Sequence, residues 1–429
     1  MHILMSKFNF LRIIGNSLFR DTFFLLLTQI AKYILPLTTI PYLARILGPE
    51  VWGLILFTQS FSQWLQILLE YGFGLSATRD ISRHRDNKDE IADVVAGVLS
   101  ATCLLIATSF FLSITLGLSI PILSKHWNYT ILAWMLAVFQ SISPFWYFQG
   151  TERLQIPATL DIVVRLVSTI ATFMFVQNGD DAWKILVFQG ASSLIVSVVL
   201  ICWMYKEIPW RSPRIYLAIS GLKSGFSIFI FRGSVSLYTV ANTLILGFLM
   251  PASMIAFFAG AEKISKSLFG LLVPMSQAVF PRISYLLTNN VNSALRLLKI
   301  SLFVMVGTSI LLMLFLIWTA PILVHFILGD QFKPAIPLIR ILSLLLPLIA
   351  LSTVLGVQWM LPLGFDRAFS LITISAGFVN ISLGLLLTRW FGLQGMAWAV
   401  VFSELFVTVG VTSVLLKNNF GLKKPLANL

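Results

Sequence analysis

The sequence predicts an all-α polytopic membrane protein with about twelve transmembrane helices. Of its 429 residues, 58% are hydrophobic and only 11% are charged, whereas soluble domains contain about 25% charged residues. The apolar residues run in blocks of about twenty, the length that a helix needs to cross the bilayer core. A β-barrel would instead show alternating segments of about ten residues, and none stand out in this sequence.

The apolar blocks locate the expected spans. In chain order they cover residues 22–45, 51–72, 92–118, 129–149, 156–177, 183–205, 224–248, 253–280, 300–321, 335–361, 368–388 and 394–416. Before them, Phe8, Leu11, Ile14 and Leu18 recur at helical spacing without a small-residue cleavage site. We therefore expect no cleavable signal here, but a helix along the inner membrane surface.

The basic residues orient these spans. With the N-terminus in the cytoplasm, the inner segments contain 19 of the 30 lysines and arginines, and the outer segments contain five. Cytoplasmic loops are enriched in Lys and Arg, so both termini are expected in the cytoplasm. The same rule explains the net charge of +13 without a nucleic-acid partner.

An inner segment near residues 206–223 divides the spans into two groups of six. We therefore predict an N-terminal lobe, 1–210, and a C-terminal lobe, 211–429. Leu47-Gly48-Pro49 aligns with Leu249-Met250-Pro251, which is weak support for parallel repeats related by an axis along the membrane normal.

The chain lacks the motifs of a soluble enzyme. It contains no phosphate-binding glycine loop, no metal-ligand spacing among its cysteines and histidines, and no nucleophile elbow. The sequence therefore predicts a protein that is not an enzyme and needs no metal or cofactor.

Charged residues inside the spans are the main functional signal, because a charge at bilayer depth costs at least about 2.5–3.5 kcal/mol. Two pairs have helical i,i+4 spacing with the acid first, Asp161 with Arg165 and Glu262 with Lys266. Self-neutralising ion pairs and functional charges are equally good interpretations of these pairs.

The remaining intramembrane charge is mainly cationic and suits an anionic substrate. Phosphate or pyrophosphate fits best, because Lys and Arg bind phosphoryl oxygens through charge-assisted hydrogen bonds. Snorkelling to an interface is the alternative; it suits Arg340, near the end of a span, better than Lys32 or Lys263. The candidate substrate-binding residues are Lys32, Arg232, Lys263, Lys266 and Arg340.

Acidic residues in the spans are candidates for ion coupling. Asp161, Glu262 and Glu404 lie deepest in the apolar segments, where each could carry a proton. We prefer Glu404, because no basic residue lies one turn away from it.

Three stretches resemble a known family. They are Leu35-Pro36-Leu37-Thr38-Thr39-Ile40-Pro41-Tyr42-Leu43-Ala44-Arg45-Ile46-Leu47-Gly48-Pro49, Tyr71-Gly72-Phe73-Gly74 through Ala77-Thr78-Arg79, and Phe145-Trp146-Tyr147-Phe148-Gln149-Gly150-Thr151-Glu152. They are similar to polysaccharide transporters of the multidrug/oligosaccharidyl-lipid/polysaccharide exporter superfamily. Within it, the chain resembles Wzx-type O-antigen flippases.

The resemblance implies a V-shaped, two-lobed helical bundle in the bacterial inner membrane. It implies alternating-access movement of an undecaprenyl-pyrophosphate-linked oligosaccharide between the leaflets, with proton or sodium antiport. Membrane lipids and polysaccharide polymerase or assembly proteins are the implied partners. For Trp146, Tyr147 and Phe148 we favour an interfacial belt over substrate contact.

Three alternatives differ in what they require. A cation-coupled multidrug exporter of the same superfamily needs an acidic cavity, which the excess of Lys and Arg argues against. A peptidoglycan-precursor flippase generally carries fourteen spans. A membrane-embedded glycan polymerase or ligase typically has a large outer loop, and the expected outer loops are short.

Overall fold

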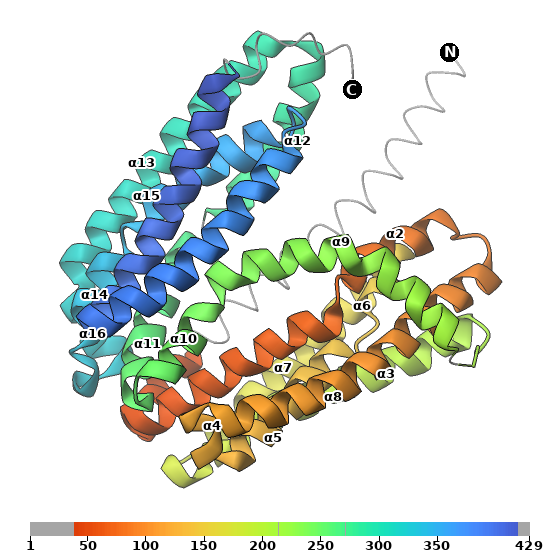
Figure 1. The fold of residues 1–429 in the computed structure, drawn as a ribbon, viewed down its shortest axis with the longest axis horizontal. Coiled ribbons are helices and arrows are strands. Elements are labelled where there is room, and N and C mark those ends of the chain that lie inside the picture. The colour runs from red at the N-terminus through yellow and green to blue at the C-terminus, as the bar shows by residue number, and fades with distance from the viewer. Residues whose placement is uncertain (1–37, 213, 271, 419–429) are drawn as a thin grey trace. The chain divides into compact units, whose positions relative to one another are not determined.

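The computed structural model describes residues 38–212, 214–270 and 272–418, which form helices joined by short connections (Figure 1). Within these ranges the chain has no β-strand. Eight of the described segments are long and apolar enough to cross a membrane. The prediction of an all-α polytopic membrane protein is therefore confirmed.

The described residues divide into two compact units. Unit 1 comprises residues 38–42, Leu65–Ser119 and His126–Ile230. Unit 2 comprises Leu43–Trp64, Ile120–Lys125 and residues 231–418. The predicted lobes 1–210 and 211–429 stay a prediction.

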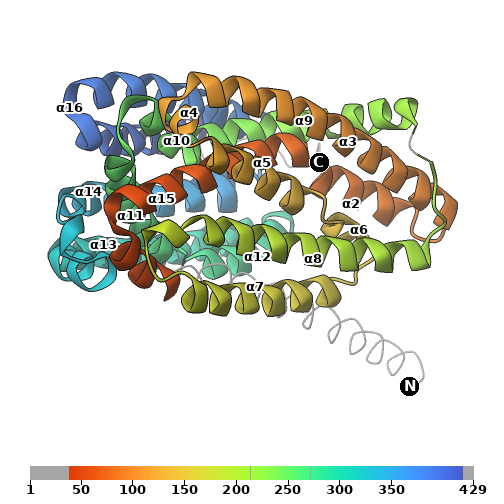
Figure 2. The ribbon, with the colours of Figure 1, turned by 90° about the horizontal axis from the view of Figure 1, so that it is seen from below.

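Unit 1 is a bundle of long helices, in which α8 packs against both α5 and α7, and α2 packs against α6 (Figure 2). A helix over residues 38–70 precedes these elements and contributes residues 43–64 to unit 2. The further helices of unit 1 are α2 (Phe73–Arg83), α3 (Lys88–Ser119), α5 (Trp127–Ser141), α6 (Phe145–Gly150), α7 (Gln155–Phe175), the 3₁₀ turn η1 (Gly179–Asp181), α8 (Trp183–Glu207) and the first part of α9 (Ile215–Thr239).

Unit 2 is built around α16, which packs against α10, α14 and α15, while α13 packs against α12 and α15. Its elements are α4 (Pro121–Lys125), α10 (Ala241–Leu249), α11 (Ala252–Phe269), α12 (Val273–Asn289), α13 (Val291–Leu323), the π-helical η2 (Val324–Leu328), the 3₁₀ turn η3 (Asp330–Phe332), α14 (Ala335–Leu342), α15 (Leu345–Ser352), the π-helical η4 (Thr353–Met360) and α16 (Asp366–Lys417).

Two of the eight segments are longer than one crossing requires. Thr38–Arg83 has 46 residues and Asp366–Lys417 has 52, whereas about 20 suffice. Each contains a glycine with positive φ, Gly48 at +68° and Gly392 at +61°, at the positions expected between two spans. The pairs α9–α10 and α11–α12 cover two further expected spans, so the helices agree with a count of about twelve.

Two expected spans are interrupted. The span expected at 129–149 stops at Ser141 and resumes at Phe145, after Pro144, which has no N–H to donate to a continuing helix. The span expected at 253–280 ends at Phe269, and α12 begins at Val273 with a proline in its first turn. Proline is tolerated there because the first N–H groups have no partner within the helix.

Candidate functional site

The charged residues of α11 fall into one ion pair and one further cation. The carboxylate of Glu262 is buried and lies 2.9 Å from Lys266 Nζ. Lys263 is half-buried, and among the residues that the structure describes it has no hydrogen-bond or ion-pair partner. Lys263 is therefore a cation in an apolar helix without a hydrogen-bond or ion-pair partner in the described part of the chain.

A chain of buried hydrogen bonds leads from Glu262 into the interior of unit 2. Asn242 Nδ2 on α10 donates to Glu262 Oε1 at 3.4 Å, and Asn380 Nδ2 on α16 donates to Asn242 Oδ1 at 2.7 Å. Ser403 Oγ, also on α16, donates to Asn380 Oδ1 at 3.1 Å. Networks of this kind hold three helices in one arrangement when their members are satisfied. Asn242, Asn380 and Ser403 were not among the residues expected from the sequence; amide side chains isolated in apolar blocks are the signal that could have found the two asparagines.

Glu404 lies on α16 directly after Ser403 and is 7% exposed. Its Oε1 accepts a hydrogen bond of 2.6 Å from Ser352 Oγ, at the end of α15. Among the described residues it has no ion-pair partner. The carboxyl group of Glu404 therefore has no described hydrogen bond or ion pair with Glu262 or Lys266.

A second polar group is buried in the π-helical segment η4. Gln358 accepts a hydrogen bond from Ser301 Oγ at 2.7 Å and donates to Ser276 Oγ at 3.2 Å. The side chain is fully buried, so these bonds satisfy an amide that would otherwise cost free energy. Gln358 joins α12 and α13 to the span that contains η4.

Arg340 does not join the α11 charges in the structure. It is exposed on α14, and its Nε donates to the Ile317 carbonyl oxygen of α13 at 3.3 Å. Lys32 and the side chain of Arg232 lie outside what the structure describes. Of the three described cationic candidates, Lys263 has no described hydrogen-bond or ion-pair partner, Lys266 pairs with Glu262, and Arg340 binds a backbone carbonyl.

The α13–α14 connection borders a cavity of about 390 Å³ in unit 2. Arg45 donates to the Phe326 carbonyl oxygen at 2.6 Å, so it is already bound to the backbone of η2. His325 Nδ1 lies 3.1 Å from Asp330 Oδ1. The hydrogen bond with His325 holds the pKa of Asp330 below its ordinary value.

In unit 1, Asp161 and Arg165 form the predicted ion pair on α7, with Arg165 Nε 2.8 Å from Asp161 Oδ2. Asp161 is buried, and Arg165 is half-buried. The pair therefore neutralises itself within one helix, as one of the two interpretations expects. Its role in coupling stays a prediction.

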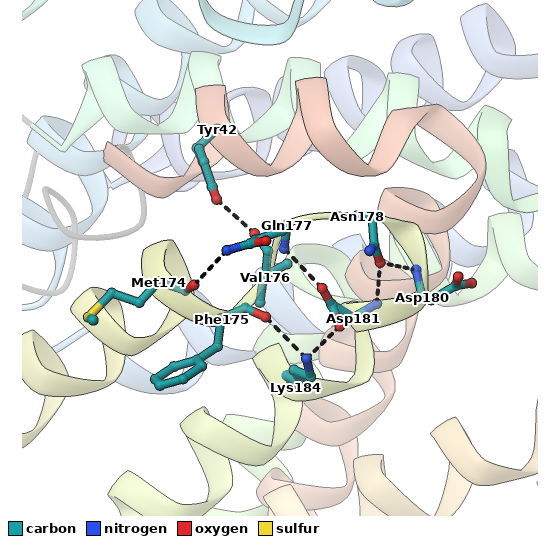
Figure 3. Close-up of polar contacts among 9 residues, drawn as sticks. All are labelled: Tyr42, Met174, Phe175, Val176, Gln177, Asn178, Asp180, Asp181 and Lys184. Atoms are coloured by element: carbon teal, nitrogen blue, oxygen red, sulfur yellow. Dashed lines mark hydrogen bonds and ion pairs between the residues drawn. The ribbon is translucent and has the colours of Figure 1, made fainter.

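Hydrogen bonds and an ion pair hold the connection between α7 and α8 in place (Figure 3). Asn178 Oδ1 accepts from the backbone N–H groups of Asp180 and Asp181, and Lys184 pairs with Asp181. Tyr42 donates its hydroxyl to the Val176 carbonyl oxygen at 2.7 Å. Tyr42 thus satisfies a carbonyl oxygen at the end of α7, and Asn178 satisfies N–H groups at the start of η1.

The aromatic stretch in α6 is part of the interior of unit 1. Trp146, Tyr147 and Phe148 are all buried, so the expected interfacial belt is wrong for them. Glu207 accepts hydrogen bonds from Tyr147 Oη at 2.8 Å, Arg153 Nη1 at 2.7 Å and Trp203 Nε1 at 3.2 Å. The stretch therefore fastens the α6–α7 turn to the end of α8.

A second contact holds the same turn. Arg85 Nη2 lies 2.9 Å from Glu152 Oε1, and Glu152 has a φ of +58°, a conformation uncommon for residues other than glycine. The hydrogen bond from Arg85 and the guanidinium charge hold the pKa of Glu152 below its ordinary value, and the bond to Glu152 raises the pKa of Arg85.

Comparisons with known proteins agree with this architecture. The chain is 32% identical over 410 residues to a protein of Escherichia coli (strain K12), covering 94% of this chain and 97% of that one. It is 28% identical over 399 residues to a protein of Shigella dysenteriae, covering 91% and 98%. Both bear the name "Putative O-antigen transporter".

Solved structures share the fold at low sequence identity. The inward closed conformation of the lipid II flippase MurJ has a TM-score of 0.72 at 16% identity, covering 94% of this chain and 89% of that one. The inward-facing conformation of a multidrug resistance MATE family transporter of the MOP superfamily has a TM-score of 0.67 at 16% identity, covering 92% and 96%. The model of the polysaccharide biosynthesis protein family matches residues 18–287. The chain belongs to the polysaccharide biosynthesis protein family.

Proposed function

We propose that this protein is a flippase that moves an undecaprenyl-pyrophosphate-linked oligosaccharide, the repeat unit of an O-antigen, across the bacterial inner membrane. The observation that carries the proposal is the 32% identity over nearly the full length of a relative named for O-antigen transport. The multi-pass helical fold, shared with a lipid II flippase, supports the same class of activity. In this account the chain transports its substrate and catalyses no covalent step.

The substrate's pyrophosphate is the group that the cationic residues recognise. Lys263 supports this proposal, because it presents a charge in an apolar helix without a described partner. An incoming phosphoryl oxygen would compensate that charge through a charge-assisted hydrogen bond. Lys32 and Arg232 are proposed to share this role, and Lys266 and Arg340 are proposed to assist from their present contacts.

Alternating access requires two halves that change their relation during the cycle. We assign these to lobes 1–210 and 211–429, with both termini in the cytoplasm as the distribution of basic residues predicts. Reporter fusions at the inner and outer connections test this topology. A cytoplasmic reporter that is active at the α7–α8 connection would contradict it.

Ion coupling is assigned first to Glu404, with a proton as the ion. The absence of a described ion pair supports this choice, because Asp161 and Glu262 are each bound to a cation on their own helix. If transport driven by a pH gradient is unchanged in Glu404→Gln, this assignment fails. Sodium-driven transport would then make Glu262 and Asp161 the next candidates.

The proposal is tested in the native bacterium after deletion of this gene. Expression of the protein is expected to restore long-chain O-antigen, measured on gels of lipopolysaccharide, and single Gln substitutions of Lys32, Arg232 and Lys263 are expected to reduce it. Lys299→Gln, which alters an exposed lysine of α13, is the matched control. The unaltered protein could instead fail to restore O-antigen and rescue a strain that lacks its peptidoglycan-precursor flippase. That result would contradict the proposal and identify the protein as a peptidoglycan-precursor flippase. Full activity of all three variants would contradict the cationic site.

A further inference from the structure

Ser352 provides the described hydrogen bond that orients the carboxyl group of Glu404. Ser352 Oγ lies 2.6 Å from Glu404 Oε1, and both residues are 7% exposed. Thr408, one turn further along α16, binds the Glu404 backbone carbonyl and not its carboxyl group. The orientation of the carboxyl group therefore depends on a single hydroxyl in the described part of the chain.

Charged groups near this carboxyl are few in the elements that pack on α16. The helices α10 and α15 and the segment η4 contain no titratable residue. On α14, Arg340 binds the backbone of α13. The neighbouring α11 contributes Glu262, Lys263 and Lys266, and α16 itself contributes Asp366, Arg367, Arg389 and Lys417. None of these forms a described ion pair with Glu404, so the hydroxyl of Ser352 is the contact that responds to its charge.

The hydroxyl of Ser352 has two acceptors within reach. Besides Glu404 Oε1, it lies 3.2 Å from the Ile349 carbonyl oxygen. A serine hydroxyl has one proton to donate and two lone pairs that accept. When Glu404 is ionised, Ser352 donates to the carboxylate. When Glu404 binds a proton from water, the new O–H group donates to Ser352 Oγ, and Ser352 donates to Ile349.

Both protonation states therefore fit the same atomic positions. We infer that Ser352 is a positioning residue for proton binding and release at Glu404. This inference rests on the proposed function, in which Glu404 carries the coupled proton. It adds Ser352, an uncharged residue, to the charged residues that are candidates for coupling. It also explains how the charge of Glu404 on α16 changes the hydrogen bonding at the end of α15.

The location of Ser352 gives this change a structural consequence. Ser352 is the last residue of α15, and the π-helical segment η4 begins at Thr353. The N–H of Thr353 is shared between the carbonyl oxygens of Ala350 and Ile349. Protonation of Glu404 redirects the Ser352 hydroxyl to this same Ile349 carbonyl. The hydrogen bonding at the junction thus depends on the proton, and π-helical turns occur frequently at functional sites.

The inference is tested on the purified full-length protein by infrared difference spectroscopy during a titration from about pH 4 to about pH 9. The carboxyl band that disappears in Glu404→Gln identifies Glu404. Ser352→Ala removes a charge-assisted bond to the ionised form and a weaker neutral bond to the protonated form, so the midpoint of this band is expected to move to higher pH by about one unit. Ser352→Thr keeps the hydroxyl and is expected to restore the midpoint.

The matched control is Ser343→Ala. Ser343 lies in the same expected span, is buried, and donates to the Arg340 carbonyl oxygen at 2.7 Å, so the midpoint should stay unchanged. An unshifted midpoint in Ser352→Ala, or a Glu404 band that does not titrate, would overturn the inference. Absence of lipid-linked oligosaccharide transport by the unaltered protein would instead contradict the proposed function, and the infrared titration separates these two failures.

Discussion

The hydroxyl of Tyr147 and the carboxylate of Glu207 lie 2.8 Å apart and join α6 to the end of α8. The bond is partly buried, and two further donors share the same carboxylate. The aromatic stretch of α6 therefore contributes a side chain to the interior of unit 1, where it holds the α6–α7 turn.

Tyr147→Phe removes this hydroxyl while keeping the ring. Because hydrogen bonds to charged groups contribute about 1.5–3 kcal/mol and Glu207 keeps two other donors, we expect a loss of about 1–2 kcal/mol. The measurement is the apparent unfolding temperature of the purified protein. Tyr205→Phe is the control, since Tyr205 lies on α8 without a described hydrogen-bond partner; equal effects of the two variants would contradict the contact.

A close helix approach in unit 2 leads to a second prediction. A Cβ atom at Gly53 would lie 1.8 Å from the Ala252 carbonyl oxygen, whereas one at Gly307 would meet nothing within 4 Å. Gly53→Ala is expected to destabilise the protein by about 1–3 kcal/mol or more, because backbone must move. Gly307→Ala should be neutral or stabilising, since alanine has the higher helix propensity. A stable Gly53→Ala protein in thermal unfolding would show that this approach is incorrect.

The Asp161–Arg165 pair permits a double-mutant cycle. Arg165→Gln leaves a buried carboxylate without its partner, and the expected cost is about 1–3 kcal/mol. Asp161→Asn added to Arg165→Gln should recover part of that loss, because the uncompensated charge is then absent. Thermal unfolding of the two single variants and the double variant measures the coupling. Additive effects would mean that the two side chains do not interact.

The Arg85–Glu152 contact predicts a pH dependence outside the spans. The folded protein lowers the pKa of Glu152 from its ordinary 4.5, so the pair stabilises the fold above that value. The stabilisation is lost as the pH falls through the lowered pKa. Since the pair is largely exposed, its contribution is at most about 1 kcal/mol.

Unfolding temperatures measured from neutral to acidic pH test this contribution. Glu152→Gln should lower the temperature at neutral pH and show a weaker decline on acidification than the unaltered protein. Glu50→Gln is the control, because Glu50 is exposed and has no described ion-pair partner. Identical pH dependence in the Glu152→Gln variant and the unaltered protein would contradict the assignment.

Helix boundaries were predictable where a glycine must leave the helical conformation. The expected gaps between spans contain Gly48 and Gly392, and both have positive φ, which glycine adopts without steric cost. The break between α11 and α12 was also predictable, because Pro274 interrupts the span expected at 253–280 and lies in the first turn of α12. The break between Ser141 and Phe145 was missed, since hydrophobic residues continue on both sides of it and periodicity alone does not reveal where a helix restarts.

The ion pairs were predictable and the buried amide network was not. Helical spacing alone brings Asp161 to Arg165 and Glu262 to Lys266 on one face. The hydrogen bond between Asn242 and Asn380 joins two residues that are 138 positions apart in the sequence. Such contacts depend on which face each helix turns inward, and a single sequence does not determine those rotations.

The proposed activity is tested most directly by measuring the flipping of an undecaprenyl-pyrophosphate-linked oligosaccharide by the purified protein in proteoliposomes. We expect transport by the unaltered protein and by Lys299→Gln, and a rate reduced about tenfold or more in Lys263→Gln, because a charge-assisted bond to the pyrophosphate is lost. Transport of this lipid at the same rate in all three proteins would contradict the role of Lys263. No transport by any of them would contradict the flippase itself.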